Sequence, residues 1–303
     1  MTIETKDPKR YPVLRNLQFS PLKDEEEKYV VLWDPTGLTS EKLVVPLNYF
    51  FLLQNFDGGH SLEEIGAEYL RRFGEFFMPD RLERLVEDLD AKLFLEGDKV
   101  EAAKARAREA YRKGSVRPAA FAGKSYEAET EKLAAQLDEF FRSPEGPPIK
   151  ASENRGKPIK GLVVPHYEVR MGGPVYAWAY KELREAEVPD LYVVVGTCHA
   201  GLEHGFTLTD KDFETPLGRL SVDQDVVARL RKQTGEVLFE EEISHRVEHS
   251  IEFQVPFLQH LVGRNKPITF VPILSAFPPS CLFDPQLQGL GDTVKRFLDA
   301  IRE

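Results

Sequence analysis

Short apolar runs separated by turn residues occupy the first hundred positions and predict a small winged helix-turn-helix domain over residues 1–100. Residues 29–35, YVVLWDP, have the β-branched and aromatic content of a short strand. The apolar run at 44–56 predicts a buried helix, because the turn signal DGG follows it directly. The domain is therefore expected to open with a strand and a helix.

Two further helices are predicted from their end signals. Ser61 and Glu64 have the spacing of a capping box, and the apolar positions that follow recur at helical spacing as far as Gly74. Pro79 can occupy the first turn of the next helix. The segment LFLEGDKV at 93–100 then predicts the small wing.

A change of pattern marks a second domain. Residues 101–116 are rich in Ala, Lys, Arg and Glu and predict an exposed connecting helix. Within residues 117–303, three continuous apolar runs alternate with helical segments, at 160–166 (KGLVVPH), 191–199 (LYVVVGTCH) and 269–274 (TFVPIL). Such runs are typical of buried strands, so we expect an α/β domain with a mostly parallel sheet and helices on both faces.

Composition narrows the classes of partner. The net charge is −10, which opposes binding to the negatively charged backbone of a nucleic acid. No apolar stretch reaches the ~18 residues that a membrane-spanning helix needs. The first residues lack the apolar core of a secretory signal, so we expect a cytoplasmic protein. Cys198 and Cys281 are the only cysteines, so any metal must rely on histidine and carboxylate ligands.

Two histidines follow predicted strands at equivalent positions. His166 and His199 each stand just past the carboxyl end of an apolar run, where open α/β sheets bind their ligands. A single histidine at such a place is more often a hydrogen-bonded structural residue, but two of them favour a shared metal or small-molecule site. Cys198 precedes His199, and a buried small side chain is its expected role.

A second cluster lies in the segment HRVEHSIEFQ. It places His245, Glu248, His249 and Glu252 within two predicted helical turns, with the histidines four residues apart on one face. The string also fits H-x-x-E-H, the signature of a class of zinc metallopeptidases. This alternative ranks second, because such enzymes need a further carboxylate ligand well downstream.

Six segments together resemble the Memo-like family in order and spacing. They are RPAAFAGKSY (117–126), PHYEVRMGGP (165–174), GTCHAG (196–201), DFETPLG (212–218), EHSIEFQVPFLQ (248–259) and FVPIL (270–274). The family includes the B component of the AmmeMemoRadiSam system, and its fold is similar to class III extradiol dioxygenases, which hold non-haem iron by two histidines and a carboxylate. The resemblance implies Fe(II) or another divalent metal, redox chemistry and a radical SAM protein as partner.

The same resemblance implies roles for individual residues. His166 and His199 match the family's strand-end histidines and would bind the metal, while His249 would donate or take a proton. Glu248 or Glu252 would orient His249, although a solvated or helix-capping carboxylate is an equal reading of Glu252.

Several departures from the family pattern affect these expectations. Phe121 stands where the family often has histidine, and Glu168 follows His166 closely enough to supply an acidic group instead. The family continues into a strand with an Asp-x-x-His segment, whereas this sequence ends at Glu303. We therefore expect a missing third ligand, either because the sequence is a fragment or because this member has shed it.

The last predicted helix leads to a related expectation. The segment VKRFLDAIRE at 294–303 resembles a crossover helix with one apolar face, formed by Val294, Phe297, Leu298 and Ile301, but no strand follows it. We expect an open sheet edge or groove beside His166 and His199, with exposed apolar surface.

The first domain resembles a PqqD-like module, which captures a peptide or protein segment at a strand edge. Residues 1–100 hold 13 Lys or Arg against 20 Asp or Glu, a net charge of −7. The predicted third helix includes Glu83, Glu87, Asp88 and Asp90, which would repel phosphates. We thus expect a peptide or protein partner rather than DNA, and a non-catalytic binding scaffold stays open as an alternative to an enzyme.

Overall fold

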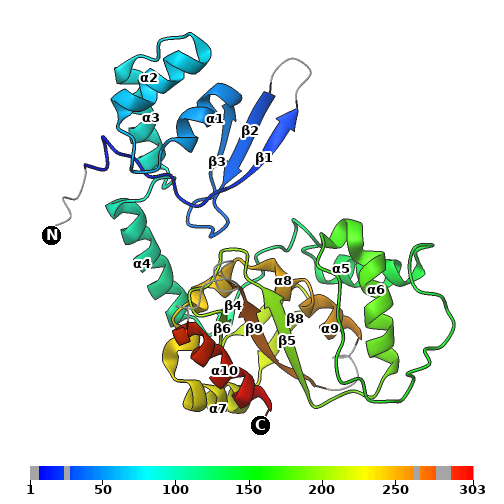
Figure 1. Ribbon diagram of the computed structural model, residues 1–303. Coiled ribbons are helices and arrows are strands. Elements are labelled where there is room, and N and C mark those ends of the chain that lie inside the picture. Colours follow the sequence, from blue (N-terminus) through cyan, green and yellow to red (C-terminus); the bar gives the residue numbers. More distant parts are fainter. Residues whose placement is uncertain (1–6, 24–27, 262–266, 278–287, 303) are drawn as a thin grey trace. The chain divides into compact units, whose positions relative to one another are not determined.

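The computed structural model describes residues 7–23, 28–261, 267–277 and 288–302 (Figure 1). The chain divides into two compact units, Met1–Ala110 and Tyr111–Glu303, each with its own hydrophobic core. Helix α4 (Asp98–Lys113) runs across the boundary between them. Each unit is described by itself below.

The first unit begins with a three-stranded antiparallel sheet of order β1-β2-β3, formed by β1 (Gln18–Lys23), β2 (Lys28–Trp33) and β3 (Lys42–Pro46). Helix α1 (Leu47–Gln54) follows directly. The expectation of one helix over 44–56 is thus wrong at its start. Val44 and Val45 pair with β2 instead, as β-branched residues favour, and Pro46 in an extended conformation is the N-cap of α1.

Helix α2 (Leu62–Phe73) confirms the end signals found in the sequence. Ser61 and Glu64 form the reciprocal capping box, and Gly74 ends the helix with φ of 70°, a conformation that glycine adopts without strain. Helix α3 (Pro79–Ala91) begins at the predicted proline. Helix α2 packs on α1, and α3 packs on α2, through a core that includes Leu52, Ile65 and Leu89.

The predicted wing at 93–100 is wrong. Leu95 makes only an isolated bridge to Leu14, and Asp98 already begins α4. Asp98 and Glu101 lie in the first turn of a segment rich in strong helix formers, where negative charge stabilises a helix. The sheet of this unit therefore precedes its helices instead of following them.

The second unit has the expected mixed α/β architecture with a mostly parallel sheet flanked by helices. The sheet order is β4-β7-β8-β9-β5, with β6 also paired to β9. The pairs β4–β7, β8–β9 and β5–β9 are parallel, and β7–β8 and β6–β9 are antiparallel. The strands are β4 (Val116–Arg117), β5 (Leu191–Thr197), β6 (Phe206–Leu208), β7 (Asp212–Thr215), β8 (Gly218–Val222) and β9 (Thr269–Ser275).

Helices cover this sheet through aromatic and aliphatic contacts. Phe257 of α9 stacks on Tyr176 and Tyr180 of α6 with ring centroids 5.2 and 4.8 Å apart. Phe297 of α10 packs against Phe206 and is buried, whereas Leu298 and Ile301, expected on the same face, are exposed. The helices are α5 (Thr130–Arg142), α6 (Val169–Glu185), α7 (Gln224–Thr234), α8 (His249–Glu252), α9 (Val255–Leu261) and α10 (Gln288–Arg302), with 3-10 turns at Glu236–Phe239 and Glu242–Arg246.

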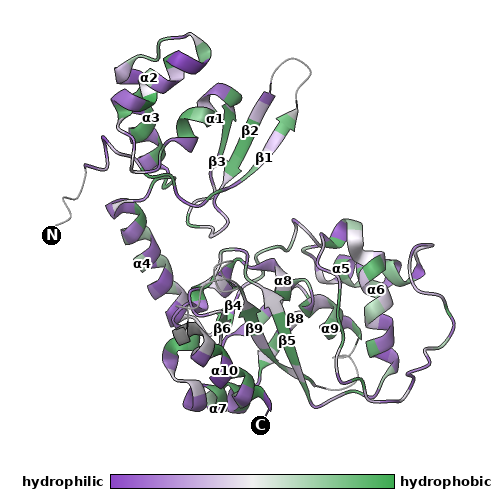
Figure 2. Cartoon of the chain, viewed as in Figure 1, coloured by the Kyte–Doolittle hydropathy of each residue, from purple (hydrophilic) through white to green (hydrophobic). Residues whose placement is uncertain are grey.

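One predicted strand does not form, and another is only partly buried. Residues 160–166 form no strand and pair with none among the described residues, so the strand predicted there is wrong. Strand β5 lies at the edge of the sheet, and the apolar side chains of Val193 and Val195 are 48% and 60% exposed. Figure 2 shows the contrast between the apolar strands and the polar outer faces of the helices. In the described part of the chain, no helix has the length and hydropathy that crossing a membrane would require.

Candidate metal centre

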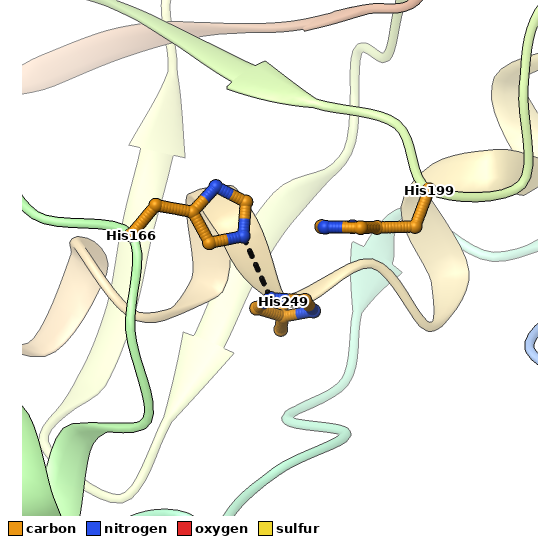
Figure 3. Close-up of side chains that lie close together, drawn as sticks. All are labelled: His166, His199 and His249. Carbon is orange, nitrogen blue, oxygen red and sulfur yellow. Dashed lines mark hydrogen bonds between the residues drawn. The ribbon is translucent and has the colours of Figure 1, made fainter. Parts of the chain in front are cut away.

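Three histidines from distant parts of the sequence meet beside the end of β5 (Figure 3). His166 lies in the loop that precedes α6, His199 follows β5 by two residues, and His249 is the first residue of α8. One ring nitrogen from each lies within 4.8 Å of those of the other two. The convergence expected from the strand-end positions is therefore confirmed.

The spacing of the rings suits a shared ion. The Nε2 atoms of His166 and His249 are 2.9 Å apart, and the ring centroids of His199 and His249 are 4.5 Å apart. Two imidazole nitrogens that each bind one ion at about 2.0–2.1 Å stand roughly 3 Å apart when they are at right angles. The two Nε2 atoms thus have the separation of neighbouring ligands.

Glu248 fixes the orientation of two of the three rings. Its carboxylate accepts a hydrogen bond from the backbone N–H of His199 at 2.8 Å and lies 3.0 Å from Nδ1 of the same residue. It also lies 3.3 Å from Nδ1 of His249. A carboxylate on Nδ1 holds a histidine in the tautomer whose Nε2 can bind a metal. Both rings therefore keep Nε2 for a ligand.

The local sequence explains why Glu248 can do this. It is the N-cap of α8, and its side chain accepts hydrogen bonds from the backbone N–H groups of His249 and Ser250. Burial raises the pKa of its carboxyl, but these donors and His199 outweigh burial and hold the pKa below its usual range. Glu248 is therefore ionised at neutral pH, as an orienting carboxylate must be.

The surroundings of His166 and His249 favour the neutral imidazole, which is the form that binds metals. Burial, followed by the neighbouring His199, lowers the pKa of His166. Burial also lowers the pKa of His249, with His199 and His166 acting in the same direction against the opposing charge of Glu248. Neutral imidazoles are the ligands that iron, zinc, copper and nickel accept, so this donor set fits a divalent transition metal.

Glu252 takes a different place from the one expected. Its side chain is fully buried, so the interpretation of Glu252 as a solvated carboxylate is wrong. The carboxylate accepts hydrogen bonds from Arg117, from the backbone N–H groups of Ala120 and Phe121, and from the hydroxyl of Tyr126. None of these donors belongs to the three histidines. Glu252 therefore anchors the segment 117–126 to α8.

Arg117 is the central partner in this anchor and was not singled out from the sequence. Its guanidinium pairs with Glu252 and donates to the backbone carbonyls of His245 and Glu248, each at 2.8 Å. It thereby holds the loop that presents Glu248. Arg117 stands at the start of the family motif at 117–126, which was the only sign in the sequence of its importance. The sequence alone does not show whether an arginine at that place is exposed or buried.

His245 does not join the cluster, and the H-x-x-E-H reading is therefore wrong. The 3-10 turn Glu242–Arg246 ends before Val247, so His245 and His249 do not share one helix face. The Nε2 of His245 lies 3.2 Å from the carbonyl oxygen of Thr207, and complete burial lowers its pKa to about 3. A peptidase of that type would need both histidines on one ion.

Glu168 and Cys198 also have structural roles. The Glu168 side chain caps α6 by accepting from the backbone N–H of Met171 at 3.1 Å, so it does not supply the cluster with a ligand. Cys198 is buried, its Sγ lies 3.5 Å from the carbonyl oxygen of Gly201, and burial raises its pKa to about 11. A small core side chain is the role that the sequence suggested for it.

His249 lies where a third ligand could, while the expectation that a ligand from the family's later segment is missing stays a prediction. His249 was assigned a proton-transfer role from the family resemblance, but its Nε2 lies as close to His166 as a co-ligand would. Phe121, at the position where the family often has histidine, places its ring edge-on to His249 with centroids 5.7 Å apart. The described residues thus offer three nitrogens to one ion.

A mostly parallel α/β domain with a histidine cluster beyond its strand ends defines a class of candidate metalloproteins. Residues 117–281 match the sequence profile of the family described as Memo-like protein. This match covers more than half of the chain, which therefore belongs to the Memo-like family.

Individual relatives agree with this assignment. The chain is 28% identical to a MEMO1 family protein of Aquifex aeolicus over 252 residues, which are 83% of this chain and 64% of that protein. It is 36% identical to one of Methanopyrus kandleri over 53% of this chain and 56% of that protein, and 37% identical to one of Ignicoccus hospitalis over 52% and 56%. The chain spans 56 to 64% of the length of these relatives. The Aquifex match is longer than residues 111–303, so it includes part of the first unit.

Proposed function

We propose that the second unit binds one divalent transition metal, with Fe(II) as the leading candidate, through His166, His199 and His249. The convergence of three ring nitrogens within 4.8 Å is the observation that supports this proposal. When bound, such an ion would supply Lewis-acid or redox chemistry at coordination positions that the protein leaves open.

The residues around the cluster have separate tasks in this proposal. Glu248 holds His199 and His249 through their Nδ1 atoms, and its own backbone carbonyl is held by Arg117. The side chains of His199 and His249 remain 35% and 28% exposed, so a substrate can approach the cluster from solvent. The Nε2 atoms of His166 and His249, 2.9 Å apart, would be the first pair of ligands to the ion.

Metal analysis of the untagged protein tests this proposal. We expect about one metal ion per chain, and at least a tenfold lower metal content in His166→Ala, His199→Ala and His249→Ala. His60→Ala is the matched control, because His60 lies in the first unit, pairs with Asp57 and faces solvent. Equal metal content in all four variants would refute the site.

A partnership with a radical SAM protein follows from the family resemblance, and the first unit is the proposed contact. Phe19, Leu22 and Val44 are exposed apolar side chains on its three-stranded sheet, and β1 and β3 are its two edges. Such a surface suits PqqD-like capture of a peptide or protein segment by strand addition. Iron-dependent redox chemistry carried out together with this partner is the activity that we propose.

Titration of the chain with a purified radical SAM protein from the same organism tests the contact. Val44→Asp should weaken the complex about tenfold or more, whereas Ile149→Asp, a similar change at an exposed position of the second unit, should not. A complex that forms with random duplex DNA and is dissociated by salt would instead indicate nucleic-acid binding. Equal affinities of both variants would contradict the proposed surface.

A further inference from the structure

A groove of about 690 Å³ lies on the first unit, where α2 and α3 run beside each other (Figure 1). Helix α2 lines it with Leu62, Gly66 and Leu70, which stand four residues apart on one helix face. Helix α3 lines it with Leu82 and Val86. No residue of β1, β2 or β3 belongs to the lining, so the groove is a different surface from the sheet edges considered above.

The depth of the groove depends on a glycine inside a helix. Gly66 lies in the interior of α2, where glycine is less stable than almost any other residue. A Cβ added to Gly66 would have no atom within 4 Å, whereas one added to Gly173 of α6 would meet the ring of Phe140 at 2.3 Å. Packing within the described structure thus requires glycine at 173 but not at 66. The open space at Gly66 suits the close approach of something outside the unit.

The groove also has large apolar side chains at its mouth. Phe76, in the loop between α2 and α3, is 66% exposed, and Leu70 is 42% exposed. Exposed apolar surface around a hollow is a common mark of a protein-binding site.

The walls favour a helix as the occupant. The backbone N–H and C=O groups within α2 and α3 are paired inside these helices, so the walls offer no row of backbone groups to an extended strand. An occupant must therefore satisfy its own backbone, as an amphipathic helix in an apolar groove does. The eight residues from Leu62 to Leu70 rise about 12 Å, so the groove accommodates roughly two to three helical turns.

The charge of the groove specifies its occupant further. Glu83 and Glu87 line it from α3, are exposed, and make no ion pair with any residue that the structure describes. Like charges four residues apart on a helix repel each other, and a cation between them would relieve this repulsion. The other charged residues of the lining balance one another, two acidic and two basic: Asp7, Glu63, Lys9 and Arg10.

We propose that this groove binds an amphipathic helix of a partner protein, with its apolar face between α2 and α3 and a Lys or Arg opposite Glu83 and Glu87. A large apolar side chain of the partner would enter the space beside Gly66. This inference depends neither on a bound metal nor on strand addition to the sheet of the first unit.

Selection from a library of 18-residue peptides displayed on their own messenger RNA, against the full chain, provides the test. Each peptide carries Leu or Ala at helical spacing and Lys or Glu at random in the flanking positions. The selected peptides should have Lys beside the apolar stripe. A proline in the middle of a selected peptide should weaken its binding at least tenfold, because proline breaks a helix.

A leucine in the groove should block these peptides. Gly66→Leu should weaken their binding at least tenfold, while the thermal unfolding midpoint should not fall, because leucine favours a helix and the space is open. Gly291→Leu on α10 is the matched control. Gly291 is also a helical glycine with no atom within 4 Å of an added Cβ, and it does not line the groove.

Neutralising the two glutamates tests the charge separately. Glu83→Gln together with Glu87→Gln should weaken binding about threefold to tenfold at low salt, with a smaller difference at high salt. Asp80→Asn together with Asp88→Asn is the control, because both residues are exposed on α3 but do not line the groove.

Each outcome decides the proposal. Basic helical peptides that lose binding with Gly66→Leu and with the glutamate changes, but not with the two controls, would support it. Failure to enrich such peptides, binding that tolerates a central proline, or equal binding to Gly66→Leu and Gly291→Leu would overturn it. Light scattering that shows a dimer abolished by Gly66→Leu would assign the groove to a second copy and likewise overturn a partner protein. Metal content should be unchanged in Gly66→Leu, which separates this inference from the metal proposal.

Discussion

Among the residues that the structure describes, each unit contains an ion pair between an arginine and a carboxylate whose side chains are both at most 4% exposed, and the two pairs hold different parts of the fold. In the first unit, Arg15 and Asp34 are 3.1 Å apart, and Asp34 also accepts from the backbone of the loop that follows it. In the second unit, Arg117 pairs with Glu252 and also binds the backbone carbonyl of Glu248, beside the histidines. The same chemistry thus fixes a loop in one unit and supports a candidate metal centre in the other.

The largest effect is expected from breaking the pair beside the histidines. Arg117→Met would leave Glu252 buried without its cation, which costs about 3–5 kcal/mol of unfolding free energy. The second unit contains Trp178 and the first contains Trp33, and these are the only two tryptophans. Denaturant unfolding of a Trp33→Phe background would therefore report the second unit alone.

Measuring the metal affinity of Arg117→Met separates a role of Arg117 at the candidate metal centre from a role in stability alone. Arg117→Met should also lower metal affinity, because the loop that presents Glu248 loses two hydrogen bonds. Loss of stability with metal affinity unchanged would show that Arg117 supports the core only.

The corresponding change in the first unit should affect stability alone. Arg15→Met leaves Asp34 buried and unpaired, and the expected cost is about 3 kcal/mol, since four backbone and hydroxyl donors still reach the carboxylate. Trp33 fluorescence in a Trp178→Phe background measures it. Metal content should equal that of the parent, and any decrease would contradict the separation of the two pairs.

Neutralising the carboxylate that orients the imidazole rings should lower the metal affinity and have a smaller effect on the free energy of unfolding. Glu248→Gln keeps the size of the side chain but loses the charge that faces the Nδ1 atoms of His199 and His249. Such changes reduce metal affinity about 10- to 100-fold, or roughly 1.4–2.7 kcal/mol. Competition with a chelator of known affinity would measure this, and an unchanged affinity would show that Glu248 serves the helix cap alone.

The smallest effect concerns a buried histidine, whereas the only histidine of the first unit, His60, faces solvent. His245 has a folded pKa of about 3, below its usual value of 6.5, so the unfolded chain takes up its proton first as the pH falls. Its contribution to stability is full above about pH 6.5 and decreases toward pH 3. Between about pH 7 and 5.5 the second unit should lose roughly 1 kcal/mol through this group.

His245→Gln should remove that part of the pH dependence, because glutamine is neutral and can still donate to the carbonyl of Thr207. Trp178 unfolding curves at both pH values would show it. An identical pH dependence in the variant would mean that His245 titrates normally in the folded state.

Local signals and non-local pairing explain which predictions succeeded. Ser61, Glu64 and Gly74 set the ends of α2 through contacts within a few residues, so the sequence determined that helix well. Residues 160–166 have the composition of a strand, but a strand exists only with a partner, and no pattern along the chain states which partner is present. The wing at 93–100 failed because helix formers after Asp98 outweighed a turn signal.

The predictions for the candidate site also succeeded where they depended on position along the chain and failed where they depended on burial. The positions of His166 and His199 after two apolar runs predicted their convergence, although only the second run forms a strand, β5. The roles of Glu252 and His245 depended on burial by segments more than 30 residues away, as with Thr207 at His245 and Arg117 at Glu252. The family motifs marked these residues without showing which ones face solvent.

The pairing of Arg117 with Glu252 also bears on the order of events during synthesis. The two residues are 135 positions apart. At about 5–20 residues per second, the guanidinium would leave the ribosome roughly 7 to 27 s before its carboxylate. During that interval neither the anchor nor the loop that presents Glu248 can form, so the nascent histidines His166 and His199 are available to any ion or chaperone before their final geometry exists. Binding of the proposed metal in its final geometry should therefore follow, rather than precede, completion of α8.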